Sequence, residues 1–126
     1  MKKMNNKGFT LAELLIVVAI IAVLVAIAIP VFTTQLEKAR EATDVANVRS
    51  AYGAAVSQYL SQTTPAPISV TVKATQTIAG WQNGDGGHMY LSTNIGSFAK
   101  QVEITNHVAN DNFTVNVKSD GTVTVD

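Results

Sequence analysis

The sequence predicts an α+β fold in which one long N-terminal helix precedes a small antiparallel sheet. Three features support this class. An apolar run from Leu14 to Ile29 leads into an alanine-rich segment with apolar residues at helical spacing. Prolines at 65 and 67 then end the helical pattern, and the remaining segments alternate apolar and polar residues like half-buried strands. A helix over residues 9–62 would be about 80 Å long, so its hydrophobic half is expected to project and its amphipathic half to pack on the sheet.

Charge is distributed unevenly along the 126 residues, although nine Lys and Arg balance nine Asp and Glu. Three of the nine basic residues, Lys2, Lys3 and Lys7, precede Gly8, which leaves six in a mildly acidic remainder. No basic patch in that remainder indicates a nucleic-acid partner. The chain has no cysteine, which excludes disulfides and thiolate metal sites.

Residues 9–32 are predicted to form a single membrane-spanning helix. The sixteen apolar residues from Leu14 to Ile29, extended at both ends, approach the roughly 20 residues needed to cross a bilayer. The preceding lysines favour a cytoplasmic N-terminus and an outward C-terminal part. A conventional cleavable signal would have a shorter apolar stretch and a small-residue cleavage site after it, and "AIAIP" runs directly into Pro30.

The stretch "KGFTLAELL", residues 7–15, resembles the N-terminal signature of type IV pilins and their pseudopilin relatives. The shared features are a short basic leader, a glycine, an aromatic residue, a Glu at fixed offset, and a long apolar helix containing a proline. The similarity covers residues 7 to about 30, and extends more loosely along the helix to about residue 60. It implies the pilin fold, with residues 33–62 as the amphipathic helix and 63–126 as the head.

The resemblance also implies how the chain is processed. Residues 1–8 are the leader, which a prepilin peptidase would cut between Gly8 and Phe9 before methylating the new amine of Phe9. Gly8 suits a protease cleft because it has no side chain. An inner-membrane assembly platform, together with minor pilins, would then add the subunit to a helical homo-oligomeric filament outside the cell.

Glu13 is a single carboxylate at the start of the apolar run. Placing such a charge in the hydrocarbon of a bilayer costs about 2.5 to 3.5 kcal/mol, and less near the membrane–water interface. The resemblance gives it a partner, because Glu13 of an incoming subunit would pair with the Phe9 amine of a neighbour and so select the register. An intramolecular contact four residues apart competes with this pairing, and a position at the headgroup level is the simpler alternative.

Pro30 is predicted to kink the helix, since it lacks an N–H and clashes with the carbonyl of Ala26. Pilins are often unwound in this region, but Ala22 stands where a glycine is frequent in the family, and alanine favours helix.

The second half of the helix is expected to pack on the sheet. Charged pairs at i,i+3 or i,i+4 are expected on its surface, namely Glu37 with Arg40, Lys38 with Glu41, and Arg40 with Asp44. The apolar stripe predicted to face the sheet consists of Val45, Val48, Tyr52, Val56 and Tyr59.

Residues 68–78 and 100–108 alternate as strands, while 79–98 is predicted as a long loop with one short strand near 88–91. The last fifteen residues predict a hairpin. A three-residue loop over 119–121 places Val117 opposite Val123, whereas a two-residue loop would mix the faces, so Gly121 is expected in the left-handed conformation.

Chemistry in the head is sparse. Asn83 and Asp85, near His88, are weak candidates for calcium ligands. Because calcium is coordinated by six to eight oxygens, a plain turn is favoured here. No metal or cofactor is predicted. His107 is expected in a loop, and Trp81 in packing rather than adhesion. No catalytic motif is present, so the chain is not expected to be an enzyme.

Two functions fit these residues. One is a subunit of an extracellular type IV pilus (fimbrium) serving adhesion, twitching motility or aggregation. In lacking cysteines, the chain resembles Gram-positive type IV pilin major subunits. The alternative is a pseudopilin of a type II secretion-like or DNA-uptake machine, although the "DPWG" stretch of the major secretion pseudopilin is missing. A single-pass receptor would need no cleavage after Gly8.

Overall fold

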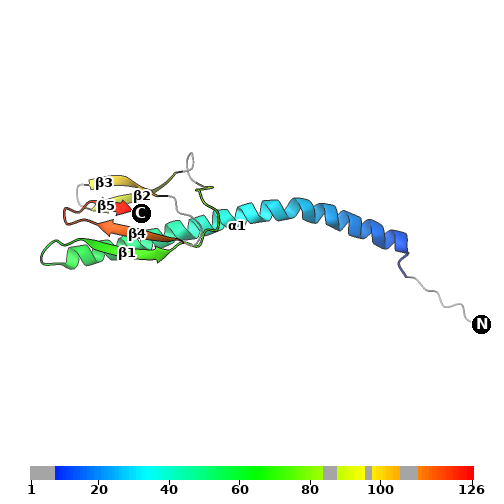
Figure 1. Cartoon of the computed structure of the whole chain (residues 1–126), viewed down its shortest axis with the longest axis horizontal. Coiled ribbons are helices and arrows are strands. Elements are labelled where there is room, and N and C mark those ends of the chain that lie inside the picture. Colours follow the sequence, from blue (N-terminus) through cyan, green and yellow to red (C-terminus); the bar gives the residue numbers. More distant parts are fainter. Residues whose placement is uncertain (1–7, 84–87, 96–97, 106–110) are drawn as a thin grey trace, which may run out of the picture. The chain divides into compact units, whose positions relative to one another are not determined.

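The structure is a computed structural model that describes residues 8–83, 88–95, 98–105 and 111–126 (Figure 1). Its described elements are one helix and five strands, which confirms the α+β class. The chain forms two units, the first ending at Gln35 and the second spanning Leu36–Asp126. The elements are α1 (Leu11–Ser61), β1 (Ile68–Lys73), β2 (Met89–Ile95), β3 (Phe98–Ile104), β4 (Asn112–Val117) and β5 (Val123–Val125).

Helix α1 continues without a break through Pro30, and residues 22–30 are helical. Proline removes one donor from the helix. The hydroxyls of Thr33 and Thr34 donate to the Pro30 carbonyl at 2.9 and 3.0 Å, a type of bond that often bends helices. The predicted kink at Pro30 stays a prediction.

The five strands form one sheet in the order β1-β4-β5-β3-β2. All neighbours are antiparallel except β3 and β5, which are parallel at Ile104 and Val125. The predicted antiparallel sheet is therefore corrected to a mixed one. The parallel pair arises because β4, the strand that follows β3 in the chain, is not its neighbour in the sheet. Strand β5 then runs antiparallel to β4, lies between β4 and β3, and is therefore parallel to β3.

The C-terminal hairpin confirms the predicted three-residue loop. Gly121 has φ of 85°, a conformation that favours glycine, and its N–H donates to the Lys118 carbonyl at 2.9 Å. The observed register pairs Val115 with Val125, Asn116 with Thr124 and Val117 with Val123.

The middle of the chain differs from the prediction. The short strand expected near 88–91 extends to Ile95 as β2, and the strand expected at 100–108 begins at Phe98 as β3. The strand predicted for 68–78 ends at Lys73. In each case the ends of the strand depend on its pairing with neighbouring strands. The alternation of residues within one strand does not reveal that pairing. His107 lies outside the described residues.

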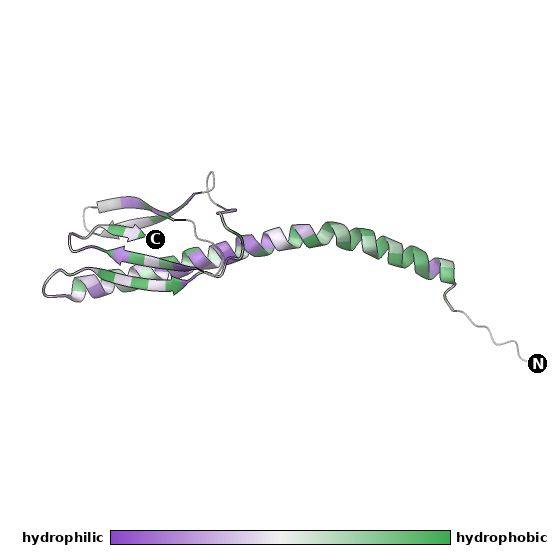
Figure 2. Cartoon of the chain, in the orientation of Figure 1, coloured by the Kyte–Doolittle hydropathy of each residue, from purple (hydrophilic) through white to green (hydrophobic). Residues whose placement is uncertain are grey.

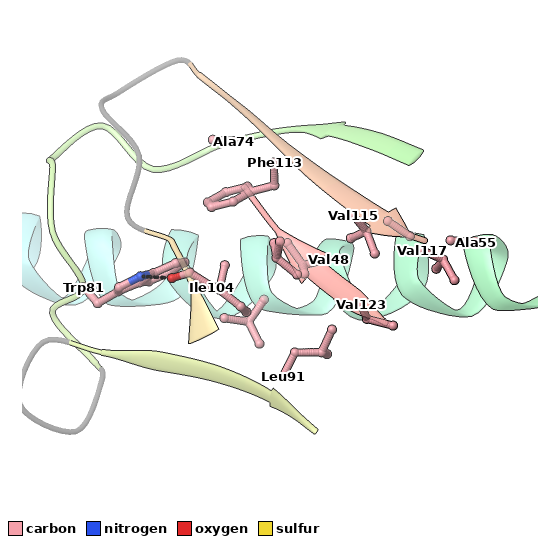
Figure 3. Packing of buried hydrophobic residues seen from close by; sticks show 13 residues of the cluster. Val48, Ala55, Ala74, Trp81, Leu91, Ile104, Phe113, Val115, Val117 and Val123 are labelled. Atoms are coloured by element: carbon pink, nitrogen blue, oxygen red, sulfur yellow. Dashed lines mark hydrogen bonds between the residues drawn. The ribbon is translucent and has the colours of Figure 1, made fainter. Parts of the chain in front are cut away.

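The core lies between the second half of α1 and one face of the sheet (Figure 3). Trp81 is buried within it, which confirms its predicted packing role. Its ring stacks on Phe113 with centroids 5.8 Å apart, and its Nε1–H donates to the Ile104 carbonyl at 3.1 Å. The indole therefore fills apolar space while its polar atom is satisfied.

Candidate functional site

The first half of α1 is hydrophobic almost throughout, whereas its second half is mixed (Figure 2). The large apolar side chains of this first half are all exposed in the structure, from 45% for Val25 to 74% for Leu11. By length and composition this helix could cross a membrane. Such a continuous apolar surface requires a bilayer or a protein partner to cover it.

Thr10 and Glu13 form a capping box at the start of α1. The Glu13 N–H donates to Thr10 Oγ1 at 3.2 Å, and the Thr10 N–H donates to Glu13 Oε2 at 3.0 Å. The two side chains thus satisfy two of the backbone donors that a helix start leaves unpaired. Thr10 was not among the partners predicted for Glu13, although the Thr-x-x-Glu pattern indicates it.

Gly8 and Phe9 lie just before the helix and are exposed. A Cβ added at Gly8 would meet nothing within 4 Å. The described residues therefore give no packing reason for a glycine at this position.

Four residues of the predicted sheet-packing stripe, namely Val45, Val48, Tyr52 and Tyr59, belong to the core or pack against it, whereas Val56 is not among the residues that do, and the structure adds two alanines. Val45 and Val48 are buried, and Tyr52, Val56 and Tyr59 are half-buried. Ala51 and Ala55 are also buried, and their small side chains let the helix approach the sheet closely. The Tyr59 hydroxyl donates to the Ser119 carbonyl at 2.9 Å, which ties the helix to the hairpin loop.

The structure corrects the predicted surface charge pairs. Glu37, Glu41 and Asp44 are at most 1% exposed. They stand at i, i+4 and i+7 and so share one face of α1; we call them the carboxylate row. Within the described residues, the carboxylates of Glu41 and Asp44 accept backbone N–H groups of the segment after β1.

Asp44 binds the beginning of that segment. Its Oδ1 accepts the N–H and the hydroxyl of Thr75, both at 2.7 Å, and its Oδ2 accepts the N–H of Gln76 at 2.9 Å. Glu41 binds the end of the segment, where it accepts the N–H groups of Gln82 at 2.6 Å and Asn83 at 2.8 Å. A buried carboxylate is tolerated here because several donors replace its lost water.

Glu37 binds the middle of the segment. Its Oε1 accepts the N–H groups of Thr77 and Ile78 at 2.7 and 2.8 Å, and its Oε2 accepts the Thr77 hydroxyl. Arg40 lies 3.4 Å from Oε2, the part of the predicted pairing that is observed. Burial raises the pKa of Glu37, but hydrogen bonds from Ile78, Thr77 and Arg40 outweigh it, and the pKa lies below its ordinary value.

The structure describes one of the two weak metal candidates, Asn83. The Asn83 amide donates to the Lys38 carbonyl at 2.7 Å, and Asp85 lies outside the described residues. Within the described ranges there is no group of three or more His, Cys, Asp or Glu side chains placed to hold a metal ion.

Comparison with known proteins links the N-terminal segment to a motif family. Residues 3–29 match the prokaryotic N-terminal methylation motif. Over 58 residues the chain is 50% identical to the type IV narrow pilus major component PilA5 of Thermus thermophilus. That match covers 44% of this chain, which spans about half the length of the curated relative. No solved structure matches.

Proposed function

We propose that the chain is a type IV pilin-like protein and a structural subunit of an extracellular type IV pilus. In this proposal the role of the chain is structural rather than enzymatic. In this proposal a prepilin peptidase removes residues 1–8 and methylates Phe9, and the mature helix assembles into a helical filament. The filament serves adhesion, surface motility or aggregation.

The contrast between the two units is the observation that most supports this proposal. The unit Leu36–Asp126 has its own buried core, while the large apolar side chains before it are exposed. A bilayer covers these side chains in the membrane-anchored precursor, and other subunits cover them in a filament. We assign residues 9–32 to this segment, 33–62 to the packed helix and 63–126 to the head.

The capping box suggests how Glu13 acts in this scheme. The carboxylate reaches back to the Thr10 N–H, one residue from the nitrogen that cleavage would free at Phe9. In the membrane this local bond partly compensates the charge. During assembly the Phe9 ammonium of a neighbour then offers a charged partner, and subunits in the wrong register lack it.

The decisive experiment is to shear cells, image the released material and determine the N-terminus of the subunit. Long fibres whose subunit begins at methylated Phe9 support a pilus, with an assembly platform and minor pilins as partners. Cleavage without releasable fibres favours a short pseudopilus instead. A subunit that retains Met1 contradicts the proposal.

A further inference from the structure

The segment that follows β1, residues 74–83 with the sequence "ATQTIAGWQN", carries no charged side chain. Ala74, Gln76 and Trp81 are buried in the head. Between them Ile78 is 49% exposed, and Ala79 beside it is also exposed. Residues 77–80 therefore present an uncharged surface with an isoleucine at its centre, and we call these four residues the Ile78 loop.

The backbone of the segment depends on the protein, and not on water, for many of its hydrogen bonds. Its bonded N–H groups are those of residues 75–78, 82 and 83, and every one of them donates to a carboxylate of the carboxylate row. An exposed loop in water does not need such acceptors, because the solvent supplies them. A loop at a lipid surface does need them, since its N–H groups lose water there.

The position of the Ile78 loop along the chain brings it close to the predicted membrane span. Glu37 follows Phe32, the last residue of that span, by five residues of α1, which is a rise of about 7.5 Å. The Ile78 N–H donates to Glu37 Oε1 at 2.8 Å. Lipid headgroups occupy about 5 to 7 Å on each side of the hydrocarbon core. In an anchored chain the Ile78 loop is therefore within reach of the headgroups next to Phe32.

The accessible charges beside the Ile78 loop are basic. Among residues 33–43, Glu37 and Glu41 are buried, whereas Lys38 is half-buried and the Arg40 side chain is 37% exposed. Arg40 also donates to the Thr77 hydroxyl at 2.9 Å, which places it against the loop. Guanidinium and ammonium groups bind phosphate oxygens through charge-assisted hydrogen bonds. An uncharged loop flanked by these two cations suits a surface of lipid phosphates above acyl chains.

We propose that the Ile78 loop rests on the bilayer surface in the membrane-anchored precursor. Ile78 enters the headgroup layer, and Lys38 and Arg40 bind lipid phosphates. Leu36, 38% exposed and one turn before Arg40 on α1, adds apolar surface on the same face. Because the span already holds the loop near the membrane, a weak contact is enough to be populated. The contact breaks when the subunit leaves the membrane. The proposal rests on the proposed function, since it requires an anchored precursor.

The test uses the full-length chain in vesicles of phosphatidylcholine and phosphatidylglycerol that carry a doxyl quencher high in the acyl chain. Since the chain has no cysteine, a fluorophore can be attached at one position through Ala79→Cys, Ser57→Cys or Val25→Cys. The label at position 25 reports anchoring. The label at position 57, about 30 Å beyond Glu37 along α1, is the reference for an exposed site in the head.

We expect the label at position 79 to be quenched about threefold or more above the label at position 57. Adding Ile78→Asp should lower this quenching to the level of position 57, because a carboxylate is disfavoured among lipid phosphates and acyl chains. Ile78→Leu keeps the apolar side chain and should retain the quenching. Gln58→Asp adds the same charge at an exposed site on α1 and should also retain it. The fluorescence of Trp81 verifies that each variant is folded.

Equal quenching at positions 79 and 57, or quenching at position 79 that survives Ile78→Asp, would overturn the proposal. Energy transfer between labels at position 79 on different copies, in place of quenching, would also overturn it, because a second copy would then cover the loop. An unquenched label at position 25 would contradict both the anchored precursor and this proposal. A quenched label at position 25 with an unquenched one at 79 contradicts the loop contact alone, so the two failures are distinguishable.

Discussion

Glu13 and the carboxylate row lie on the same helix, but their charges are stabilised in different ways. Glu13 is exposed in an apolar segment and bonds to Thr10, three residues away. The carboxylate row is buried and bonds to backbone groups 31 to 42 residues away. The segment around Glu13 therefore remains accessible to other molecules, whereas the carboxylate row makes its contacts within the head.

Because of this difference, we expect substitutions of Glu13 to affect assembly and substitutions in the carboxylate row to affect the stability of the head. A change at Glu13 is expected to affect what the segment binds and leave the head folded. A change in the carboxylate row is expected to unfold part of the head, because each carboxylate holds at least two backbone N–H groups that otherwise lose their partners.

The largest expected effect is on filament yield. Glu13→Ala should lower the fraction of subunit released by shearing about tenfold or more. Without the carboxylate, a subunit in the wrong register no longer carries an unpaired charge that disfavours it. Glu13→Gln is the matched control for the capping box, because its side-chain oxygen can still accept the Thr10 N–H. Normal filament yield from Glu13→Gln would show that the charge is not required.

The next effect is on the head. Asp44→Ala should lower the free energy of unfolding by about 3 kcal/mol, because two backbone N–H groups and a hydroxyl lose their acceptor. Urea unfolding of the detergent-solubilised chain, followed by the fluorescence of its one tryptophan, measures this. Thr43→Ala on the exposed side of α1 should change it by less than about 0.5 kcal/mol. Equal values for the two variants would contradict the proposed role of Asp44.

A smaller effect depends on pH. The pKa of Glu37 lies below the ordinary value of 4.5, so its carboxylate stabilises the head above that pH and the contribution is lost as the pH falls through the lowered pKa. Glu37→Gln should lower Tm by about 5 °C at neutral pH. The difference should shrink toward zero in acid, where Glu37 is protonated. A constant difference from neutral to acidic pH would refute this linkage.

The smallest effect is at the helix start. Thr10→Ala should destabilise the first turn by about 1 kcal/mol, which corresponds to about fivefold faster hydrogen exchange at the Glu13 amide. Thr10→Ser keeps the hydroxyl and should exchange like the wild type. If Thr10→Ala exchanges no faster, the capping box does not stabilise the helix.

Local patterns predicted the features that depend on neighbouring residues. Alternation along the last fifteen residues identified the hairpin register, because a slip by one residue would expose Val115 and Val117. The capping box could have been predicted in the same way, since Thr10 and Glu13 stand at its characteristic spacing. The mixed sheet could not, because the direction of β5 beside β3 depends on a chain crossing between distant segments.

The sequence by itself determined the apolar segment, the motif around Gly8, the long helix and the hairpin, because each follows from residues within a few turns or one strand pair. Only the tertiary structure decided that Glu37, Glu41 and Asp44 are buried. At helical spacing beside Lys38 and Arg40 they have the pattern of a solvated surface. Their burial is favourable only because the segment after β1 presents unpaired N–H groups to them, and those donors become neighbours only when the chain folds.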